Sequence, residues 1–121
     1  MVWETQKILD KSIKVNPTAV RVPVLVGHAE SIYIETKKDI NIDIAKEVLR
    51  NFSGIKLIDD TESIDFPTPF EHGHGTDDVY VGRIRKGLDK NNTLNLWVVA
   101  DNVRKGAALN SIQIAEYLTR S

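Results

Sequence analysis

A cation and an imidazole lie seven residues apart in an otherwise apolar segment, Arg21 to Glu30. Arg21 offers a planar guanidinium that fits a carboxylate or a phosphate. His28 can take up and release a proton near neutral pH. Together the two side chains could hold a small anion and carry out proton chemistry on it. The same ten residues are also consistent with a buried strand that carries one solvated arginine and one hydrogen-bonded histidine.

The spacing of Arg21 and His28 sets a condition on the backbone between them. On one straight strand the two side chains would point to opposite faces and lie about 23 Å apart, at roughly 3.3 Å per residue. A shared site therefore requires a bend, which Pro23 and Gly27 permit, because proline interrupts a strand ladder and glycine accepts angles that other residues avoid. We expect both side chains to point into one cleft, with their functional groups within about 10 Å of each other.

A second pair of possible ligands, His72 and His74, lies in the least regular part of the chain, residues 59–78. A His-x-His pair can bind a metal ion when both rings project from one side of a strand. Glycines flank His74, and no third ligand is evident. An exposed loop tip is therefore the favoured interpretation, and no metal site is predicted.

The composition is that of one ordinary globular domain. Of 121 residues, 41% are hydrophobic and 27% charged, and the net charge of -1 argues against a nucleic-acid-binding module. The longest apolar run, Val22 to Gly27, is far shorter than the ~20 residues of a membrane span. No signal peptide is recognisable after Met1, so a cytoplasmic protein without a membrane partner is expected. The chain has no cysteine, and therefore neither a disulfide nor a thiol nucleophile.

Eight segments have the periodicity of helices or strands. Apolar residues at helical spacing predict helices over 2–10, 41–52 and 103–119, the second starting at an N-cap, Asn41. Alternating or β-branched runs predict strands over 19–26, 31–36, 55–58, 79–88 and 94–100. Because Pro23 removes a backbone donor, the first of these should be an edge strand, or be bulged or broken at Pro23. Asn91-Asn92 suits the turn of a hairpin between the last two strands, and the apolar strand 94–100 should be central in the sheet.

The order of these segments predicts an α+β fold, an α/β sandwich whose mixed, largely antiparallel sheet has helices mainly on one face. Strict alternation in strand 79–88 would put Val79, Val81, Arg83 and Arg85 on one face. The other face would then carry Tyr80, Gly82, Ile84 and Lys86. Arg83 and Arg85 could be surface charges or part of a dimer contact, and the sequence leaves them unassigned.

Several motifs resemble one enzyme family, in the same order and along essentially the whole chain. They are Glu4-Thr5-Gln6-Lys7-Ile8, Arg21-Val22-Pro23-Val24 with Gly27-His28 and Glu30, Pro67-Thr68-Pro69, Val81-Gly82-Arg83-Ile84-Arg85, the run from Leu94 to Asn102, and the run from Lys105 to Ser111. Together they resemble the C-terminal, substrate-binding and dimerisation domain of aspartate-semialdehyde dehydrogenase, which has the glyceraldehyde-3-phosphate dehydrogenase-like fold. The resemblance implies one domain over residues 1–121, whose last helix, about 103–119, packs on a cofactor domain that this sequence lacks.

The chemistry implied by the resemblance belongs to the whole enzyme. That enzyme uses NADPH to reduce aspartyl phosphate to aspartate semialdehyde, with release of phosphate, for the biosynthesis of lysine, threonine and methionine. A cysteine thiolate attacks the acyl phosphate, and a hydride resolves the thioester. By match to the motifs, His28 is the catalytic acid/base, Arg21 binds the substrate's α-carboxylate, and Asn102 contacts the NADP nicotinamide. Asn102 could also be the N-cap of the last helix.

The same resemblance bears on activity and partners. Without a cysteine or a Gly-x-Gly-x-x-Gly loop, this chain alone is expected to be inactive and not to bind NADP tightly. We expect a homodimer through the sheet face that helices leave open. The apolar stripe of the last helix should be exposed, so that helix is expected to be frayed, displaced or docked on another molecule; the stripe comprises Ala107, Ala108, Ile112, Ala115 and Leu118. The alternatives are a non-catalytic homodimerisation module and an unrelated protein that binds small anions.

Overall fold

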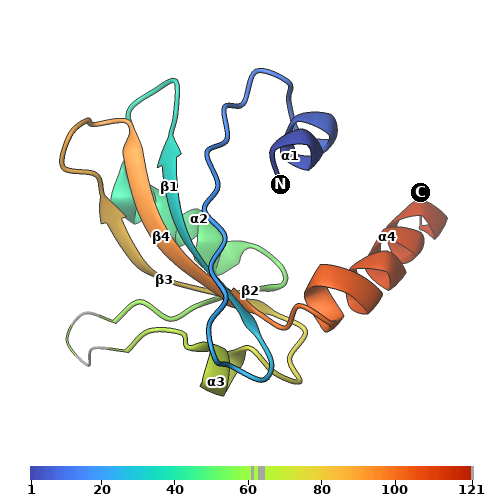
Figure 1. Ribbon diagram of the computed structural model, residues 1–121. Coiled ribbons are helices and arrows are strands. Elements are labelled where there is room, and N and C mark those ends of the chain that lie inside the picture. Colours follow the sequence, from blue (N-terminus) through green and yellow to red (C-terminus); the bar gives the residue numbers. More distant parts are fainter. Residues whose placement is uncertain (61, 63–64, 121) are drawn as a thin grey trace.

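The computed structural model of the protein describes residues 1–60, 62 and 65–120 (Figure 1). Thr61, Ser63 and Ile64 of the irregular region 59–78 lie outside the described residues. The elements are α1 (Val2–Ile8), β1 (His28–Glu35), α2 (Ile42–Asn51), β2 (Ile55–Leu57), α3 (Pro69–His72), β3 (Val79–Lys86), β4 (Thr93–Ala100), a π-helical turn (Arg104–Ala108) and α4 (Leu109–Thr119).

The described strands form one sheet in the order β1-β4-β3-β2. β4 pairs antiparallel with both β1 and β3, and β2 pairs parallel with β3. The predicted α+β fold, with its mixed and largely antiparallel sheet, is therefore confirmed, and so are the β3–β4 hairpin and the central position of β4. In the β1–β4 register, His28 lies opposite Ala100 and Glu35 opposite Thr93. The start of β1 and the end of β4 thus meet at one end of the sheet.

Helix α2 covers one face of the sheet and closes the main core. It begins as predicted, because the side-chain oxygen of Asn41 accepts hydrogen bonds from the backbone N–H groups of Asp43 and Ile44, at 2.8 and 3.1 Å. Its apolar side, formed by the half-buried Ile42, Ala45 and Leu49, packs on a buried cluster of Val81, Ile84 and Leu94. The half-buried Leu96 and Val98 of β4 pack on the same cluster. Each of these three buried side chains, Val81, Ile84 and Leu94, contributes about 1.5–3 kcal/mol by leaving water.

The predicted alternation of β3 is wrong beyond Gly82, because the strand contains a bulge. Arg83 has a positive φ of 55°, and the register with β4 shifts between Gly82 and Arg85. Ile84, rather than Arg83, therefore joins Val81 in the core, and Arg85 points to the opposite face. Asp59 stabilises the bulge, since its Oδ1 accepts a hydrogen bond from the backbone N–H of Ile84 at 3.2 Å.

A largely buried ion pair ties helix α2 to the same bulge. Lys46 Nζ on α2 lies 2.7 Å from Asp59 Oδ2. The Asp59 side chain is only 5% exposed, so the lysine compensates for the loss of water around that carboxylate. One carboxylate thus connects the helix that covers the core to the strand whose bulge reshapes it.

The strand predicted for residues 19–26 is wrong, since this segment is irregular in the structure. A strand needs a partner for its backbone, and Pro23 removes one donor from any ladder. Instead, the N–H of Val24 donates to the carbonyl oxygen of Val22 at 2.9 Å, which forms a tight turn. Most apolar side chains of the segment are exposed, namely Val20, Val22, Val24 and, completely, Leu25. β1 begins at His28, three residues before its predicted start.

Two helices stand apart from the sheet. Figure 1 shows α1 beyond one end of the sheet and α4 extending away from it. No side chain of α4 is buried, and Ile112 and Tyr117 are 56% and 77% exposed. The expected exposure of the apolar stripe is therefore present, on a regular helix. That this helix is frayed, displaced or docked on another molecule stays a prediction. No helix in the described ranges is long and apolar enough to cross a membrane.

Candidate functional site

Two of the three predicted site residues lie at the same end of the sheet. His28 is the first residue of β1 and pairs with Ala100, the last residue of β4. Asn102 follows Ala100 by two residues, in the turn that leads to the last helix. The antiparallel pairing of β1 with β4 therefore brings together residues that are separated by more than half of the chain.

His28 has a carboxylate partner, Glu30, which sequence reasoning quoted in a motif but did not assign to the site. The distance between His28 Nε2 and Glu30 Oε1 is 3.1 Å. The pair follows from strand geometry, because residues i and i+2 share a face. When Nε2 carries the proton and donates it to Glu30, Nδ1 is left to accept a proton. The histidine side chain is 60% exposed, so a substrate can reach it.

Arg21 lies in the irregular segment before β1. Its guanidinium forms no ion pair or hydrogen bond with the described part of the chain, so its donors are available to an anion. The backbone between Arg21 and His28 is not a straight strand, and Gly27 turns it with a φ of 94°. The bend that a shared site requires is therefore present. A separation of about 10 Å between the two functional groups stays a prediction.

Asp101, between Ala100 and Asn102, is a polar residue that sequence reasoning missed. It is only 3% exposed. Its Oδ1 accepts hydrogen bonds from the backbone N–H groups of Val103 and Arg104 at 2.9 and 3.1 Å, and its Oδ2 accepts one from Gly75 at 2.8 Å. Asp101 therefore performs the capping role considered for Asn102. The Asn102 amide forms no hydrogen bond with the described residues.

These hydrogen bonds hold the pKa of the Asp101 carboxyl below its usual value. The N–H of Gly75 is the largest cause, and the amides of Arg104 and Val103 act in the same direction, against the effect of burial. The carboxylate therefore stays charged over the whole physiological range of pH. Asp is as common an N-cap as Asn, so the sequence Asp101-Asn102 contained the signal without indicating which residue served.

The loop with the two histidines lies beside the same end of the sheet. His72 Nδ1 accepts a hydrogen bond from the N–H of Thr68 at 3.2 Å, and its ring lies 4.8 Å from that of Tyr80. His74 is exposed, with Nδ1 4.0 Å from Asp101 Oδ2. No group of three His, Cys, Asp or Glu side chains suited to a metal ion occurs among the residues that the structure describes.

A shallow cavity of about 330 Å³ lies on the sheet face opposite α2, lined by Ser31, Phe66, Arg83, Arg85, Leu96 and Trp97. Trp97 Nε1 donates a hydrogen bond to the carbonyl oxygen of Pro67 at 2.9 Å, which holds neighbouring Phe66 at the cavity. The Arg83 guanidinium lies over the Phe66 ring, 5.5 Å from its centroid. Neither Arg83 nor Arg85 forms an ion pair with a described carboxylate.

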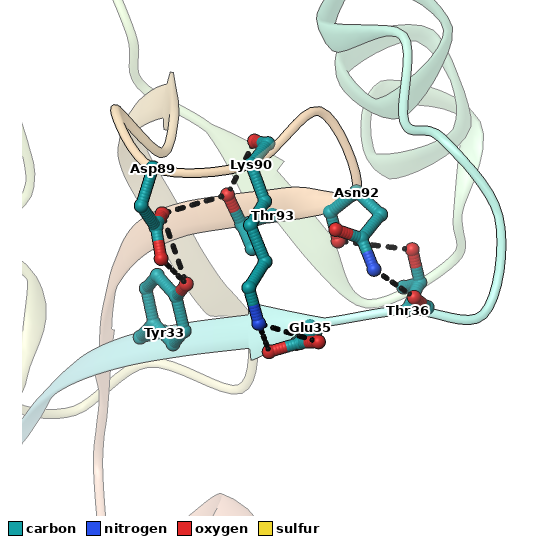
Figure 2. Close-up of polar contacts among 7 residues, drawn as sticks. All are labelled: Tyr33, Glu35, Thr36, Asp89, Lys90, Asn92 and Thr93. Atoms are coloured by element: carbon teal, nitrogen blue, oxygen red, sulfur yellow. Dashed lines mark hydrogen bonds and ion pairs between the residues drawn. The ribbon is translucent and has the colours of Figure 1, made fainter.

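Figure 2 shows a polar cluster where the β3–β4 hairpin meets the end of β1. Lys90 Nζ lies 2.9 Å from both Glu35 oxygens, and the Tyr33 hydroxyl donates to Asp89 at 2.9 and 3.1 Å. The Tyr33 hydrogen bond is the largest cause that lowers the pKa of Asp89. These contacts fasten the hairpin to the edge strand, at the end of the sheet away from His28.

Comparisons with known proteins find relatives along the whole chain. Residues 1–105 match the family described as semialdehyde dehydrogenase, dimerisation domain. The chain is 55% identical to an aspartate-semialdehyde dehydrogenase from Shewanella sp. (strain DB6705) and 51% identical to one from Legionella pneumophila, in each case over 99% of this chain and 35% of the relative. It therefore spans about a third of the length of these relatives.

The structure is also similar to a solved relative. A crystal structure of aspartate semialdehyde dehydrogenase II from Vibrio cholerae, complexed with ASA, matches 100% of this chain and 35% of its own, with a TM-score of 0.93 and 52% identity. This agreement supports the predicted resemblance of the fold to the C-terminal domain of glyceraldehyde-3-phosphate dehydrogenase-like enzymes.

Proposed function

The chain belongs to the semialdehyde dehydrogenase dimerisation-domain family, and on that basis we propose that it is the substrate-binding and dimerisation part of an aspartate-semialdehyde dehydrogenase. The observation that carries the proposal is the identity of 50% or more with such enzymes over essentially the entire chain. The whole enzyme would reduce aspartyl phosphate to aspartate semialdehyde and release phosphate, a step toward lysine, threonine and methionine. Residues 1–121 would form one domain, with α4 packed on a cofactor domain.

In this proposal the chain supplies charge recognition and proton transfer. Arg21 binds the substrate's α-carboxylate through two parallel hydrogen bonds. His28 takes the proton of a cysteine thiol, which attacks the acyl carbon and expels phosphate. It returns a proton when the thiolate later leaves, so the thiol is regenerated. Glu30 holds the imidazole through the 3.1 Å contact, and thereby orients it for both transfers. The thiol must come from another part of the enzyme, because this chain has no cysteine.

Only a small part of an NADP site is proposed for this chain. When bound, NADPH supplies the hydride that reduces the thioester. Asn102 fits the edge of a nicotinamide, because its exposed amide carries both a donor and an acceptor and uses neither within the described chain. The sequence contains no glycine-rich phosphate loop, so tight binding of NADP by this chain alone is not expected.

The sheet face opposite α2 is the proposed dimer surface. It exposes Tyr33, which is 51% exposed, and the cavity between Arg85 and Trp97. Arg85 and Tyr33 lie at the same level of the sheet, since both pair with Asn95 of the central strand. A two-fold axis that runs along β4 would place β3 of one copy opposite β1 of the other. Arg85 would then face the region of the second copy that contains Tyr33 and Asp89, so opposite charges would meet.

A chimeric enzyme tests the proposal directly. In it, residues 1–121 replace the matching segment of the Shewanella relative, which supplies the rest of the enzyme. We expect the chimera to reduce aspartyl phosphate, and His28→Ala to lower its kcat by about 10²- to 10⁴-fold. The isolated chain should show no turnover. A folded chimera without activity would contradict the proposal, as would turnover by the isolated chain or full activity in His28→Ala.

A further inference from the structure

The residues immediately before His28 and Asn102 contact the same loop. Gly27 meets Gly73 backbone to backbone: a Cβ on Gly27 would lie 2.9 Å from the carbonyl oxygen of Gly73, and one on Gly73 would lie 3.0 Å from the Cα of Gly27. No side chain larger than hydrogen fits between these backbones without a shift. Gly27 also has a positive φ of 94°, which other residues rarely adopt. The loop that contains Gly73 is therefore in close backbone contact with Gly27, the residue before His28.

The other side of the loop is held by Asp101. The carboxylate binds the N–H of Gly75 with one oxygen and the N–H groups of Val103 and Arg104 with the other. A second tie joins the same segments, because Arg104 Nε donates to Asp77 Oδ1 at 2.6 Å. The loop and the start of the helix are thus held by one buried carboxylate. The exposed Asn102 lies in sequence between Asp101 and Val103, which both take part in these hydrogen bonds.

The loop is itself anchored to the sheet. The N–H of Gly73 donates to the carbonyl oxygen of Pro69 at 3.0 Å, and the Thr76 hydroxyl donates to that of His72 at 3.0 Å. The His72 ring packs on Tyr80 of β3. A displacement of the loop would therefore have to break contacts within α3 and with β3 as well as those made by Gly27 and Asp101.

We propose that residues 73–77 act as a spacer that sets the position of His28 relative to Asn102, and that Asp101 is the positioning residue that holds this spacer. The proposal rests on the proposed function, because it takes His28 as the proton-transfer residue and Asn102 as the cofactor contact. In this proposal Asp101 contacts neither substrate nor cofactor, because its buried carboxylate is occupied by three backbone N–H groups. It acts by fixing the spacer against Gly27, so that the imidazole and the amide stay at the separation that proton and hydride transfer require.

Asp101→Asn separates the two roles of the carboxylate. An asparagine retains one oxygen that can cap the helix at Val103 and Arg104, but presents an NH2 group toward the N–H of Gly75. A matched control is Asp39→Asn, because Asp39 is exposed and forms no interaction with the described chain. On the Gly27 side, Gly73→Ala introduces a Cβ that would lie 3.0 Å from the Cα of Gly27 and 2.6 Å from the carbonyl oxygen of Pro69 in α3, so the loop must shift away from both. Gly106→Ala is its control, since a Cβ on Gly106 would meet only the Cβ of Asn102, at the ordinary van der Waals distance of 3.9 Å, and would require no shift.

The first measurement uses NMR on the 121-residue chain. In Asp101→Asn we expect faster amide exchange at Gly75, by at least about tenfold, which corresponds to loss of one charged hydrogen bond. We also expect shifted signals from the His28 ring and the Asn102 side-chain amide. A purely structural cap would alter only Val103, Arg104 and the helix beyond. Unchanged His28 and Asn102 signals, with faster exchange at Gly75, would overturn the proposal.

The second measurement uses the chimeric enzyme. Asp101→Asn and Gly73→Ala should lower kcat by about 10- to 100-fold, with a KM for aspartyl phosphate within about threefold, because misplacement affects chemistry more than binding. The two controls should behave like the parent. Gly73→Ala with the kcat of Gly106→Ala would overturn the proposal. A different result would separate the two proposals: His28→Ala leaves the chimera active while Asp101→Asn still shifts the His28 signals. In that case residues 73–77 do position His28, but the proposed function is wrong.

Discussion

Asp101 Oδ2 accepts a hydrogen bond from the N–H of Gly75 at 2.8 Å, and this bond joins the end of the central strand to the loop beside His28. The two residues are far apart in the sequence, and neither belongs to the set first selected as candidate site residues. Because the charged carboxylate of Asp101 is the better acceptor, the stability of this end of the sheet should depend on pH.

The first prediction concerns this acid dependence. The folded-state pKa of Asp101 is lowered, so its contribution to stability is present above the unfolded value of 3.8 and is lost as the pH falls through the lower folded value. Protection of the Gly75 and Val103 amides should therefore fall when the pH is taken from 5 to well below 3.8. In Asp101→Asn this component should be absent. Protection that stays constant in the parent chain would contradict the prediction.

The second prediction concerns Arg21. Arg21→Lys keeps the charge but loses the planar fork, so the substrate's carboxylate would keep only one of two parallel hydrogen bonds. In the chimeric enzyme we expect KM to rise by about tenfold, which corresponds to about 1.4 kcal/mol, with a smaller change in kcat. Arg50→Lys on α2 is the matched control. Unchanged kinetics in Arg21→Lys would remove Arg21 from the site.

The third prediction concerns the dimer surface. Arg85→Gln removes one of two cations on the sheet face opposite α2 that have no carboxylate partner in the described chain. Since a charged contact across the interface would be lost, sedimentation should show a higher dimer dissociation constant, by about three- to thirtyfold, and a weaker dependence on salt. Arg50→Gln, on the helix-covered side, should leave association unchanged. A monomeric parent chain at micromolar concentration would contradict the dimer itself.

The fourth prediction tests the bulge in β3. Ile84 is 6% exposed and belongs to the core, so Ile84→Ala should lower the free energy of unfolding by about 2–5 kcal/mol. Arg83→Gly should be neutral or stabilising, because glycine adopts the positive φ of this residue without strain. Denaturant unfolding measures both. The reverse order, with Arg83→Gly the more damaging, would indicate the unbulged strand that simple alternation predicts.

Much of the fold could be predicted from the sequence, because it depends on neighbours along the chain. The helical spacing of apolar residues and the cap at Asn41 predicted α2, and both are present. The turn at Asn91-Asn92 and the apolar run after it predicted the hairpin and its central strand, which the sheet order confirms. The motifs with Arg21, His28 and Asn102 indicated the family that the comparisons then showed. Their roles in the site stay predictions.

Only the tertiary structure decided the features that depend on partners far away in the chain. Residues 19–26 have the composition of a strand but no strand beside them, so they stay irregular. The bulge at Arg83 is stabilised by Asp59, whose carboxylate accepts a hydrogen bond from the N–H of Ile84. Asp101, rather than Asn102, caps the helix, and its second oxygen binds the N–H of Gly75 in a distant loop. The close contact of Gly27 with Gly73 could not be predicted from the hydrophobic periodicity of the sequence. Local patterns determine which elements form, whereas long-range hydrogen bonds and close packing determine where each side chain is held.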